Sequence, residues 1–215
     1  MKQISFSILI SILVISMSTL NAQQGEEIPL PQPQRTGGMP LFEALDKRQS
    51  LRSYSPGGLS SQDLSNLLWA AFGINREDGR RTAPSARNWQ QFDIYLIMAD
   101  GWYMYDANNH SIIKKGNEDL SEYAGTQDFT ATAPLNIIFV SDHSRITGNV
   151  SREKKDFNSA TDAGFISQNV YLFCASEGLA TVVRGLVDRD KLHEVLRLRP
   201  EQHVILGQSV GYPGD

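Results

Sequence analysis

The chain has 215 residues, of which 40% are hydrophobic and 20% are charged, with a formal net charge of −4. This composition is typical of a globular domain and excludes a collagen-like, low-complexity or mostly disordered chain. The negative charge argues against nucleic acid as a general partner. Cys174 is the only cysteine, which excludes a disulfide framework, and the four histidines lack the spacing of a metal site.

The first 22 residues have the pattern of a signal peptide. Lys2 precedes an apolar run from Ile4 to Leu20, and the small or polar residues Asn21 and Ala22 follow. Cleavage would give an exported protein, periplasmic or extracellular, without a stable membrane span; an uncleaved anchor is the alternative that the pattern leaves open. Residues 23–40 include four prolines and predict an extended, Pro-rich linker to a domain over residues 41–215.

The first part of this domain is predicted to be helical. A helix over residues 41–47 places Leu41, Phe42 and Leu45 on one face, and an extended stretch follows over residues 49–54. A capping pattern at Ser60 and an apolar stripe predict a second helix that ends at Gly73. Residues 75–91 form a polar, arginine-rich loop.

The remaining elements mix strands and helices. Residues 92–98, 102–105 and 110–114 predict an antiparallel meander, because Asp-Gly and Asn-Asn pairs join them. A buried strand over 135–140, a long helix over 152–177, a strand over 181–184, a helix over 189–196 and a strand over 203–210 follow. Since βαβ units do not alternate regularly, we expect an α+β fold with a mostly antiparallel sheet flanked by helices.

One motif near the end imitates a hydrolase. Residues from Gly207 to Gly211 fit the GxSxG pattern of a nucleophile elbow around Ser209. An elbow needs a following helix and later acidic and histidine partners, but only four residues follow Gly211. We therefore interpret this pattern as the end of a strand.

A stronger candidate site begins at Arg48. In an extended segment Arg48, Ser50 and Arg52 lie on one side, with roughly 6–7 Å between successive side chains. Guanidinium groups bind phosphate in a bidentate geometry, so the three residues are suited to a long polyoxygenated anion. A dipole-stabilising Arg48 and a solvated Arg52 are the structural alternative.

Two further clusters are polar. Pro84 and Ser85 favour a tight turn that exposes backbone donors, and Asn88 offers both a donor and an acceptor to a planar heterocycle. A self-bonded surface loop is an equal alternative. Near the end of the 181–184 strand, Gly185 allows a backbone N–H to approach a bound ring closely.

In this order, the clusters resemble the FMN-dependent nitroreductase family, and especially its branch similar to thiazole/oxazole dehydrogenases. The resemblance covers nearly all of residues 41–213, including RQSLRSY, TAPSARNWQ, GLATVVRG and the closing VGYP. It implies a nitroreductase-like fold and a homodimer with flavin at the subunit interface. The FMN-binding residues that it implies are Arg48, Gln49, Ser50, Arg52, Pro84, Ser85, Asn88, Gln127, Arg184 and Gly185.

Position by position, the resemblance implies distinct roles. Arg48, Ser50 and Arg52 correspond to the opening FMN motif, with cations facing the phosphate and the pyrimidine. Pro84, Ser85 and Asn88 correspond to a loop that reaches the flavin bound mainly by the other subunit. Gln127 matches an amide contact, and the backbone of Arg184 and Gly185 matches the pair near flavin N5 and O4.

The sequence departs from the family at its C-terminus. Many relatives use a later Lys or Arg for the phosphate, whereas this chain ends at Asp215, so Arg48 and Arg52 are expected to dominate, with Arg80, Arg81 or Arg87 as additional ligands. Helices are expected to form the dimer. The small residues Ala160 and Gly164, with Gln168, give the long helix a narrow face for another subunit or for packing within one subunit.

Bound FMN would transfer two electrons in a ping-pong cycle between a donor, with NADH or NADPH as candidates, and a small conjugated acceptor such as a nitroaromatic, quinone or heterocycle. No residue has the spacing of a dedicated acid or base. Trp89, Tyr123 and Phe129 are candidates for the acceptor pocket wall or for core. Two alternatives stay open: an exported flavin-binding protein without turnover, and a cofactor-free interaction module.

Overall fold

The structure, a computed structural model, describes residues 25–215. The predicted signal peptide over residues 1–22 lies outside these residues. Within the part described, no helix is both long and apolar enough to cross a bilayer.

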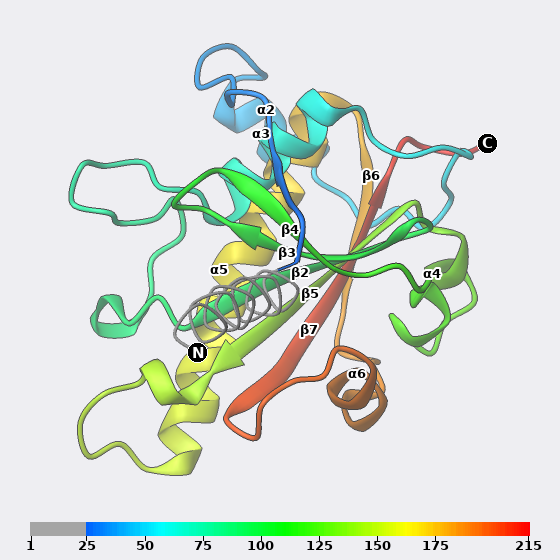
Figure 1. Cartoon of the computed structure of the whole chain (residues 1–215). Helices are drawn as coiled ribbons and strands as arrows, with labels where there is room; N and C mark the ends of the chain where they lie inside the picture. Colours follow the sequence, from blue (N-terminus) through cyan, green and yellow to red (C-terminus); the bar gives the residue numbers. More distant parts are fainter. Residues whose placement is uncertain (1–24) are drawn as a thin grey trace, which may run out of the picture.

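A seven-stranded sheet forms the centre of the molecule (Figure 1). Its strand order is β1-β4-β3-β2-β5-β7-β6, and every neighbouring pair runs antiparallel. This architecture confirms the α+β prediction. The strands are β1 (Glu27–Pro29), β2 (Phe92–Met98), β3 (Gly101–Asp106), β4 (Ser111–Gly116), β5 (Leu135–Asp142), β6 (Ala180–Arg184) and β7 (Gln202–Gly211).

Helices cover both faces of the sheet (Figure 1). On one face lie α2 (Leu41–Lys47), α3 (Ser61–Phe72) and α5 (Arg152–Glu177); on the other lie α4 (Phe129–Thr132) and α6 (Arg189–Val195). The first face buries Leu67, Ile166 and Phe139 in one apolar cluster, and the second buries Leu192 and Ile138 in another. Because successive side chains of β5 point to opposite faces of the sheet, Phe139 packs in the first cluster and Ile138 in the second.

The two long helices begin and end at the residues that the sequence predicts. The Ser60 side chain accepts a hydrogen bond from Asp63 N, and the Ser151 side chain accepts one from Lys154 N, so both serines cap free backbone N–H groups. α5 ends at Gly178, which has a φ of +69° that a side chain with a Cβ rarely adopts.

The short helix α2 has the predicted bounds, but its apolar face points away from the core. Ala44 is its only buried residue, while Leu41, Phe42 and Leu45 are exposed, Phe42 to 86%. On the adjacent α5, Phe157 and Phe165 are also exposed, and so are Ala160, Gly164 and Gln168. Of the two alternatives for this narrow α5 face, packing within one subunit is therefore wrong, because the face is exposed. The five large side chains, with the narrow face, form what we call the α2/α5 face.

Residues 25–40 are extended, as predicted, but they pack along the domain and are not a free tether. Strand β1 pairs with β4, and Ile28 and Leu30 contact the first apolar cluster. Further along, Gln34 N donates to Asn66 Oδ1 and Met39 N donates to Ser176 Oγ, both at 2.8 Å. The prolines suit this path because an edge segment needs fewer backbone donors.

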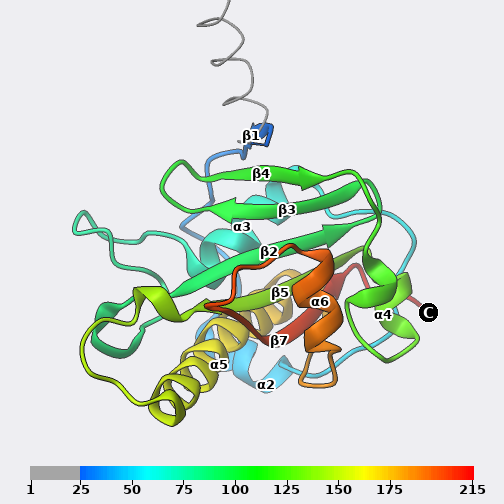
Figure 2. The same ribbon diagram turned by 60° about the horizontal axis from the view of Figure 1, so that its bottom comes forward.

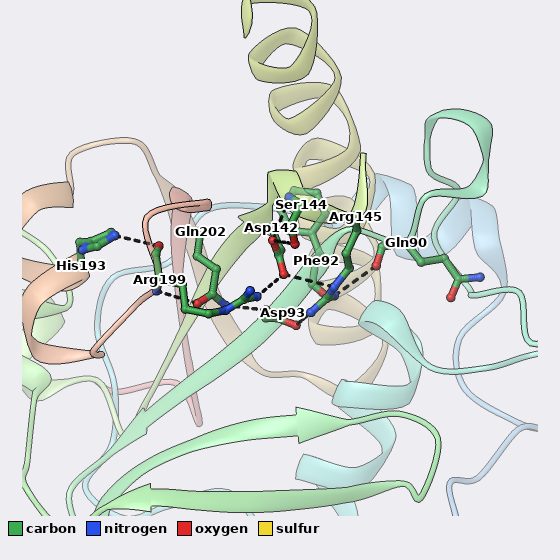
Figure 3. Close-up of polar contacts among 9 residues, drawn as sticks. All are labelled: Gln90, Phe92, Asp93, Asp142, Ser144, Arg145, His193, Arg199 and Gln202. Carbon is green, nitrogen blue, oxygen red and sulfur yellow. Dashed lines mark hydrogen bonds and ion pairs between the residues drawn. The ribbon is translucent and has the colours of Figure 1, made fainter. Parts of the chain in front are cut away.

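A polar network joins the ends of β2, β5 and β7 (Figure 3). Asp142, at 1% exposure, accepts hydrogen bonds from Ser144 and forms ion pairs with Arg145 and Arg199. Arg145 also pairs with Asp93 and donates to backbone oxygens at the end of the arginine-rich loop. Burial raises the pKa of Asp142. The hydrogen bonds from Ser144 and the charges of Arg145 and Arg199 together lower the pKa by more than burial raises it, so the pKa of Asp142 is below its ordinary value.

We expect His143 to make the fold sensitive to mild acid. Its ring is buried against His203, with 4.4 Å between ring centroids, and burial followed by the charge of His203 lowers its pKa to about 4. Between this value and the ordinary value of about 6.5, the unfolded state binds more protons than the folded state. The free energy of unfolding therefore falls, by on the order of 2 kcal/mol, as the pH decreases through this window.

Urea unfolding of the wild type and of His143→Gln at a series of pH values measures this effect. The variant is expected to lose less stability between pH 7 and pH 4.5, with a residual slope from other groups. Identical slopes in the two proteins would contradict the assignment to His143.

Candidate functional site

The segment after α2 places two predicted site residues, Arg48 and Ser50, beside α5. Arg48 lies over the Tyr171 ring, with 5.2 Å from Cζ to the ring centroid, and Ser50 Oγ is 2.8 Å from Tyr171 Oη. Leu51 N donates to Thr181 O at 2.9 Å, which fixes the segment against β6.

Gln49 and Leu51 line a cavity of about 380 Å³ between this segment, α5 and β6, and Tyr171 lines it as well. Cys174 lies at the wall of this cavity and is fully buried. Burial strongly raises the pKa of the Cys174 thiol, so the thiol stays neutral and is not a nucleophile.

Arg52 and Arg184 lie on the same aromatic ring. The Cζ atom of each is 6.0 Å from the centroid of Phe129, the first residue of α4. None of the ion pairs formed within residues 25–215 includes Arg48, Arg52 or Arg184. Arg52 and Arg184 thus share Phe129, while Arg48 lies over Tyr171, and within residues 25–215 none of the three has a carboxylate partner, which favours an anionic ligand. We call Arg48, Ser50, Arg52 and Arg184 the phosphate-side cluster.

The side chain of Arg184 is 5% exposed and bonds only to neutral acceptors. Nη1 donates to Ser209 Oγ at 2.7 Å, and Nη2 donates to Asn136 Oδ1 and to Ala124 O, both at 2.8 Å. Burial lowers the pKa of Arg184 to about 10, so the group remains charged at neutral pH. Its Nε has no acceptor within the described residues, which leaves a buried donor unsatisfied.

This network also confirms the interpretation of the GxSxG pattern. Ser209 lies within β7, fully buried, and its Oγ donates to Asn136 Oδ1 at 2.6 Å. It is part of the support beneath Arg184 and not a nucleophile elbow.

Gly185 and Gln127 lie on the same side of the molecule as Arg184. Gly185 directly follows β6, is exposed, and has space around it, since an added Cβ would meet no atom within 4 Å. Arg189 Nη1 donates to Gly185 O at 3.3 Å, and Thr126 N donates to Leu186 O at 3.4 Å. The second bond joins the loop that contains Gln127 to the end of β6.

Pro84, Ser85 and Asn88 lie elsewhere in the subunit. They belong to the arginine-rich loop, which Figure 1 shows on the opposite side of the molecule from the C-terminus. The C-terminal residues bond to the segment after Arg52, because Gly214 N donates to Ser53 O at 3.1 Å. Within one subunit, this loop therefore lies on the opposite side of the molecule from the phosphate-side cluster.

Sequence reasoning missed the buried supports of the site. Tyr171 holds Ser50 and also accepts a hydrogen bond from Val183 N at 3.0 Å, and Asn136 binds Arg184. The available signal for Asn136 was a single amide within the apolar run LNIIFV, where a buried polar side chain requires a partner. No comparable signal distinguishes Tyr171 from an ordinary core tyrosine.

The fold and the cationic site define a class of ligand-binding α+β protein, and comparison with known proteins identifies its family. A model of the nitroreductase family matches residues 45–212. A Methanocaldococcus jannaschii protein named as a nitroreductase is 32% identical over 195 residues, which is 86% of this chain and 96% of that protein. A Ralstonia eutropha protein described as a nitroreductase, whose crystal structure is known, has 40% sequence identity with this chain and superposes with a TM-score of 0.83. The match covers 88% of this chain and 90% of the Ralstonia chain.

A more distant relative is the FMN reductase [NAD(P)H] of Bacillus subtilis, 24% identical over 81% of this chain and 66% of that protein. The chain belongs to the nitroreductase family. The residues present fit the FMN that this family implies, because the unpaired cations match a phosphate and the space at Gly185 admits a ring close to the backbone.

Proposed function

We propose that this protein transfers two electrons by ping-pong hydride chemistry to or from a small conjugated substrate, such as a nitroaromatic, a quinone or a heterocycle. We also propose that it belongs to the branch of the family that is similar to thiazole/oxazole dehydrogenases. The observation that most supports the proposal is the phosphate-side cluster, with its three guanidinium groups and no carboxylate, beside the open backbone at Gly185.

The enzyme class rests on family membership. The chain is an FMN-dependent oxidoreductase of the nitroreductase type. Because the Bacillus subtilis relative is named for NAD(P)H, we propose NADH or NADPH as the electron donor.

The residues have separate roles in this proposal. Arg48 and Arg52 bind the FMN phosphate and neighbouring polar atoms, and Tyr171 fixes Ser50 for the same contact. The network of Asn136 and Ser209 holds Arg184 rigidly, which fixes the backbone position of Gly185. When bound, FMN supplies hydride acceptance and donation. No side chain is assigned as a general acid or base, and both Cys174 and Tyr54 stay protonated at neutral pH, since burial raises their pKa values.

Two subunits are required to complete this site. Pro84, Ser85 and Asn88 are separated from the phosphate-side cluster of their own subunit, so we propose that they contact the FMN of the partner. The exposed α2/α5 face supports such a homodimer, because several large apolar side chains exposed on one side of a domain mark an interaction surface.

Phe42→Asp tests the dimer. Phe42 is 86% exposed in the subunit, so a charge there does not disturb the monomer fold, but burying it in an interface is costly. Sedimentation is expected to give a dimer for the wild type and a monomer for the variant, with FMN affinity reduced at least tenfold. A monomeric wild type that binds FMN fully would contradict the shared site.

The spectrum of the purified protein, followed by anaerobic reduction, tests the function. Yellow protein that is bleached by NADH or NADPH and reoxidised by a nitroaromatic or quinone supports an enzyme. Yellow protein that no donor reduces favours the exported flavin-binding protein without turnover. Colourless protein without affinity for FMN would reject both.

Gly185→Ala separates ligand binding from folding. Because the added Cβ meets no protein atom and φ is not positive, we expect the unfolding free energy of the apo protein to change by less than about 0.5 kcal/mol. FMN affinity is expected to fall at least tenfold, since the methyl group occupies space needed by the ring. Gly58→Ala, another position without neighbours within 4 Å, is the matched control and should leave FMN affinity unchanged.

We also propose that the protein is exported, on the support of the charged and apolar pattern of residues 1–22. The mass and N-terminal sequence of the protein recovered from its native cells test this. A chain that starts at Gln23 outside the cytoplasm is the expected result, and a full-length cytoplasmic chain would contradict it.

A further inference from the structure

A large cavity lies between the N-terminal segment, α3 and α5, and the flavin site does not explain it. Its volume is about 580 Å³, and small-molecule sites typically occupy roughly 300–1,000 Å³. Residues 34–39 form one of its walls, and α2, which follows this segment, lies against α5 (Figure 2). No residue of the phosphate-side cluster lines this cavity, which we call the α3/α5 cavity.

One cation and one anion line the cavity without an ion-pair partner. None of the ion pairs among residues 25–215 includes Arg35 or Glu177, and the two do not pair with each other. A gap therefore separates two opposite charges on the walls of one cavity. A ligand that carries one group of each sign would be attracted to both.

The position of Glu177 favours a positively charged ligand group. Glu177 is the last residue of the 26-residue helix α5, and the last turn of this helix contains no basic residue. Because the C-terminus of a helix carries a partial negative charge, an acidic side chain there is unfavourable without a nearby cation. Ser176 Oγ donates to Glu177 Oε1 at 2.9 Å and accepts from Met39 N at 2.8 Å, which holds the carboxylate at the cavity wall.

Arg35 is arranged to bind a carboxylate. Its Cζ atom lies 5.2 Å from the centroid of the Trp69 ring, which is fixed because Trp69 Nε1 donates to Ile74 O at 3.1 Å. A guanidinium stacked on an aromatic ring keeps the N–H donors at its edge free, and two of them match the two oxygens of a carboxylate. Gln34 N donates to Asn66 Oδ1 at 2.8 Å, which anchors the backbone directly before Arg35.

Apolar side chains line the cavity as well. Met39, Leu172 and Phe173 are half-buried there, as is Trp69. An apolar ligand group placed against them would be removed from water, which is favourable. The walls thus combine two separated opposite charges with an apolar surface, and this combination is complementary to an amino acid with a hydrophobic side chain.

We propose that the α3/α5 cavity binds a zwitterionic ligand. Its carboxylate contacts Arg35, its ammonium group contacts Glu177, and its apolar side chain packs on Leu172 and Phe173. Two sources have this chemistry, a free amino acid and a short peptide. The site goes beyond the proposed function, and its test does not require bound flavin.

Calorimetric titration of the purified protein with L-leucine and, separately, with glycyl-L-leucine tests the cavity. The test variant is Arg35→Gln/Glu177→Gln, which removes one charge of each sign from exposed side chains and leaves the net charge unchanged. The matched control is Arg197→Gln/Glu118→Gln, which removes the same two charges from an exposed ion pair outside the cavity.

At least one probe is expected to bind the wild type and the control alike and to bind the test variant at least about tenfold more weakly, because each charged contact is lost. The probe with the higher affinity identifies the source. The absence of binding of both probes to the wild type, or equal affinities in the test variant and the control, would overturn the proposal.

Two derivatives of the tighter probe test its charged groups one at a time. Its C-terminal amide lacks the carboxylate, and its N-acetyl form lacks the ammonium group. Each is expected to bind the wild type at least about tenfold more weakly than the probe itself. Binding of either derivative as tight as that of the probe would contradict the zwitterion assignment, whether or not the protein binds FMN.

Discussion

Replacing Arg48 and Arg52 together by alanine is expected to weaken FMN binding by about 3–6 kcal/mol, or more than 100-fold. Each residue is positioned to donate a charged hydrogen bond, which contributes about 1.5–3 kcal/mol. The two side chains lie over Tyr171 and Phe129 without a carboxylate partner, so their removal leaves no buried anion unpaired. The fold should therefore remain intact.

Quenching of FMN fluorescence on titration with apo protein measures this affinity. Arg48→Lys/Arg52→Lys keeps the charge but loses the planar donor pair, and an intermediate affinity is expected. Arg152→Ala/Arg197→Ala controls for net charge. An affinity equal to that of the wild type in the alanine variant would remove Arg48 and Arg52 from the site.

Asp142→Ala is expected to cost about 1–3 kcal/mol of unfolding free energy, because the N–H and hydroxyl groups of Ser144 lose their buried acceptor, while the partly exposed Arg145 and Arg199 become solvated. Asp142 joins the Ser144 turn after β5 to Arg199, which precedes β7, and to Arg145, which contacts the base of the arginine-rich loop (Figure 3). One substitution thus loosens three segments.

Urea unfolding at pH 7 measures the loss, and Asp156→Ala is the control. Asp156 is half exposed and pairs with Arg152, so its loss should cost less than about 1 kcal/mol. Because the folded-state pKa of Asp142 is lowered, its contribution is complete above the unfolded value of about 3.9 and is lost as the pH falls through the folded value. A variant as stable as the control would show that the network contributes little.

The sequence predicted elements well where local and tertiary preferences agree. α5 has the predicted bounds because Ser151 caps its first turn, Gly178 ends it, and an apolar face packs on the sheet. The hairpins of β2, β3 and β4 follow from short turn pairs between apolar runs. These signals lie within a few residues of the elements that they specify.

Other features depend on contacts between distant residues. The apolar spacing of α2 indicated a helix, but it could not indicate that Phe42 faces outward. The prolines of residues 25–40 indicated an extended chain, but strand β1 forms only because β4 offers an unpaired edge. In the candidate site, the placement of Arg48 and Ser50 near one another followed from the sequence, whereas the burial of Arg184 depends on acceptors from β5 and β7.

The path of residues 25–40 has a consequence for solubility. An antiparallel sheet terminates in a row of free amide and carbonyl groups that can recruit strands from other molecules, and β1 occupies that row along β4. Its last bonds include Leu30 N to His110 O at 3.1 Å, directly after the strand. A chain shortened to begin at Leu41 would uncover this margin and promote intermolecular β-pairing, even though every element around the flavin site would still be encoded.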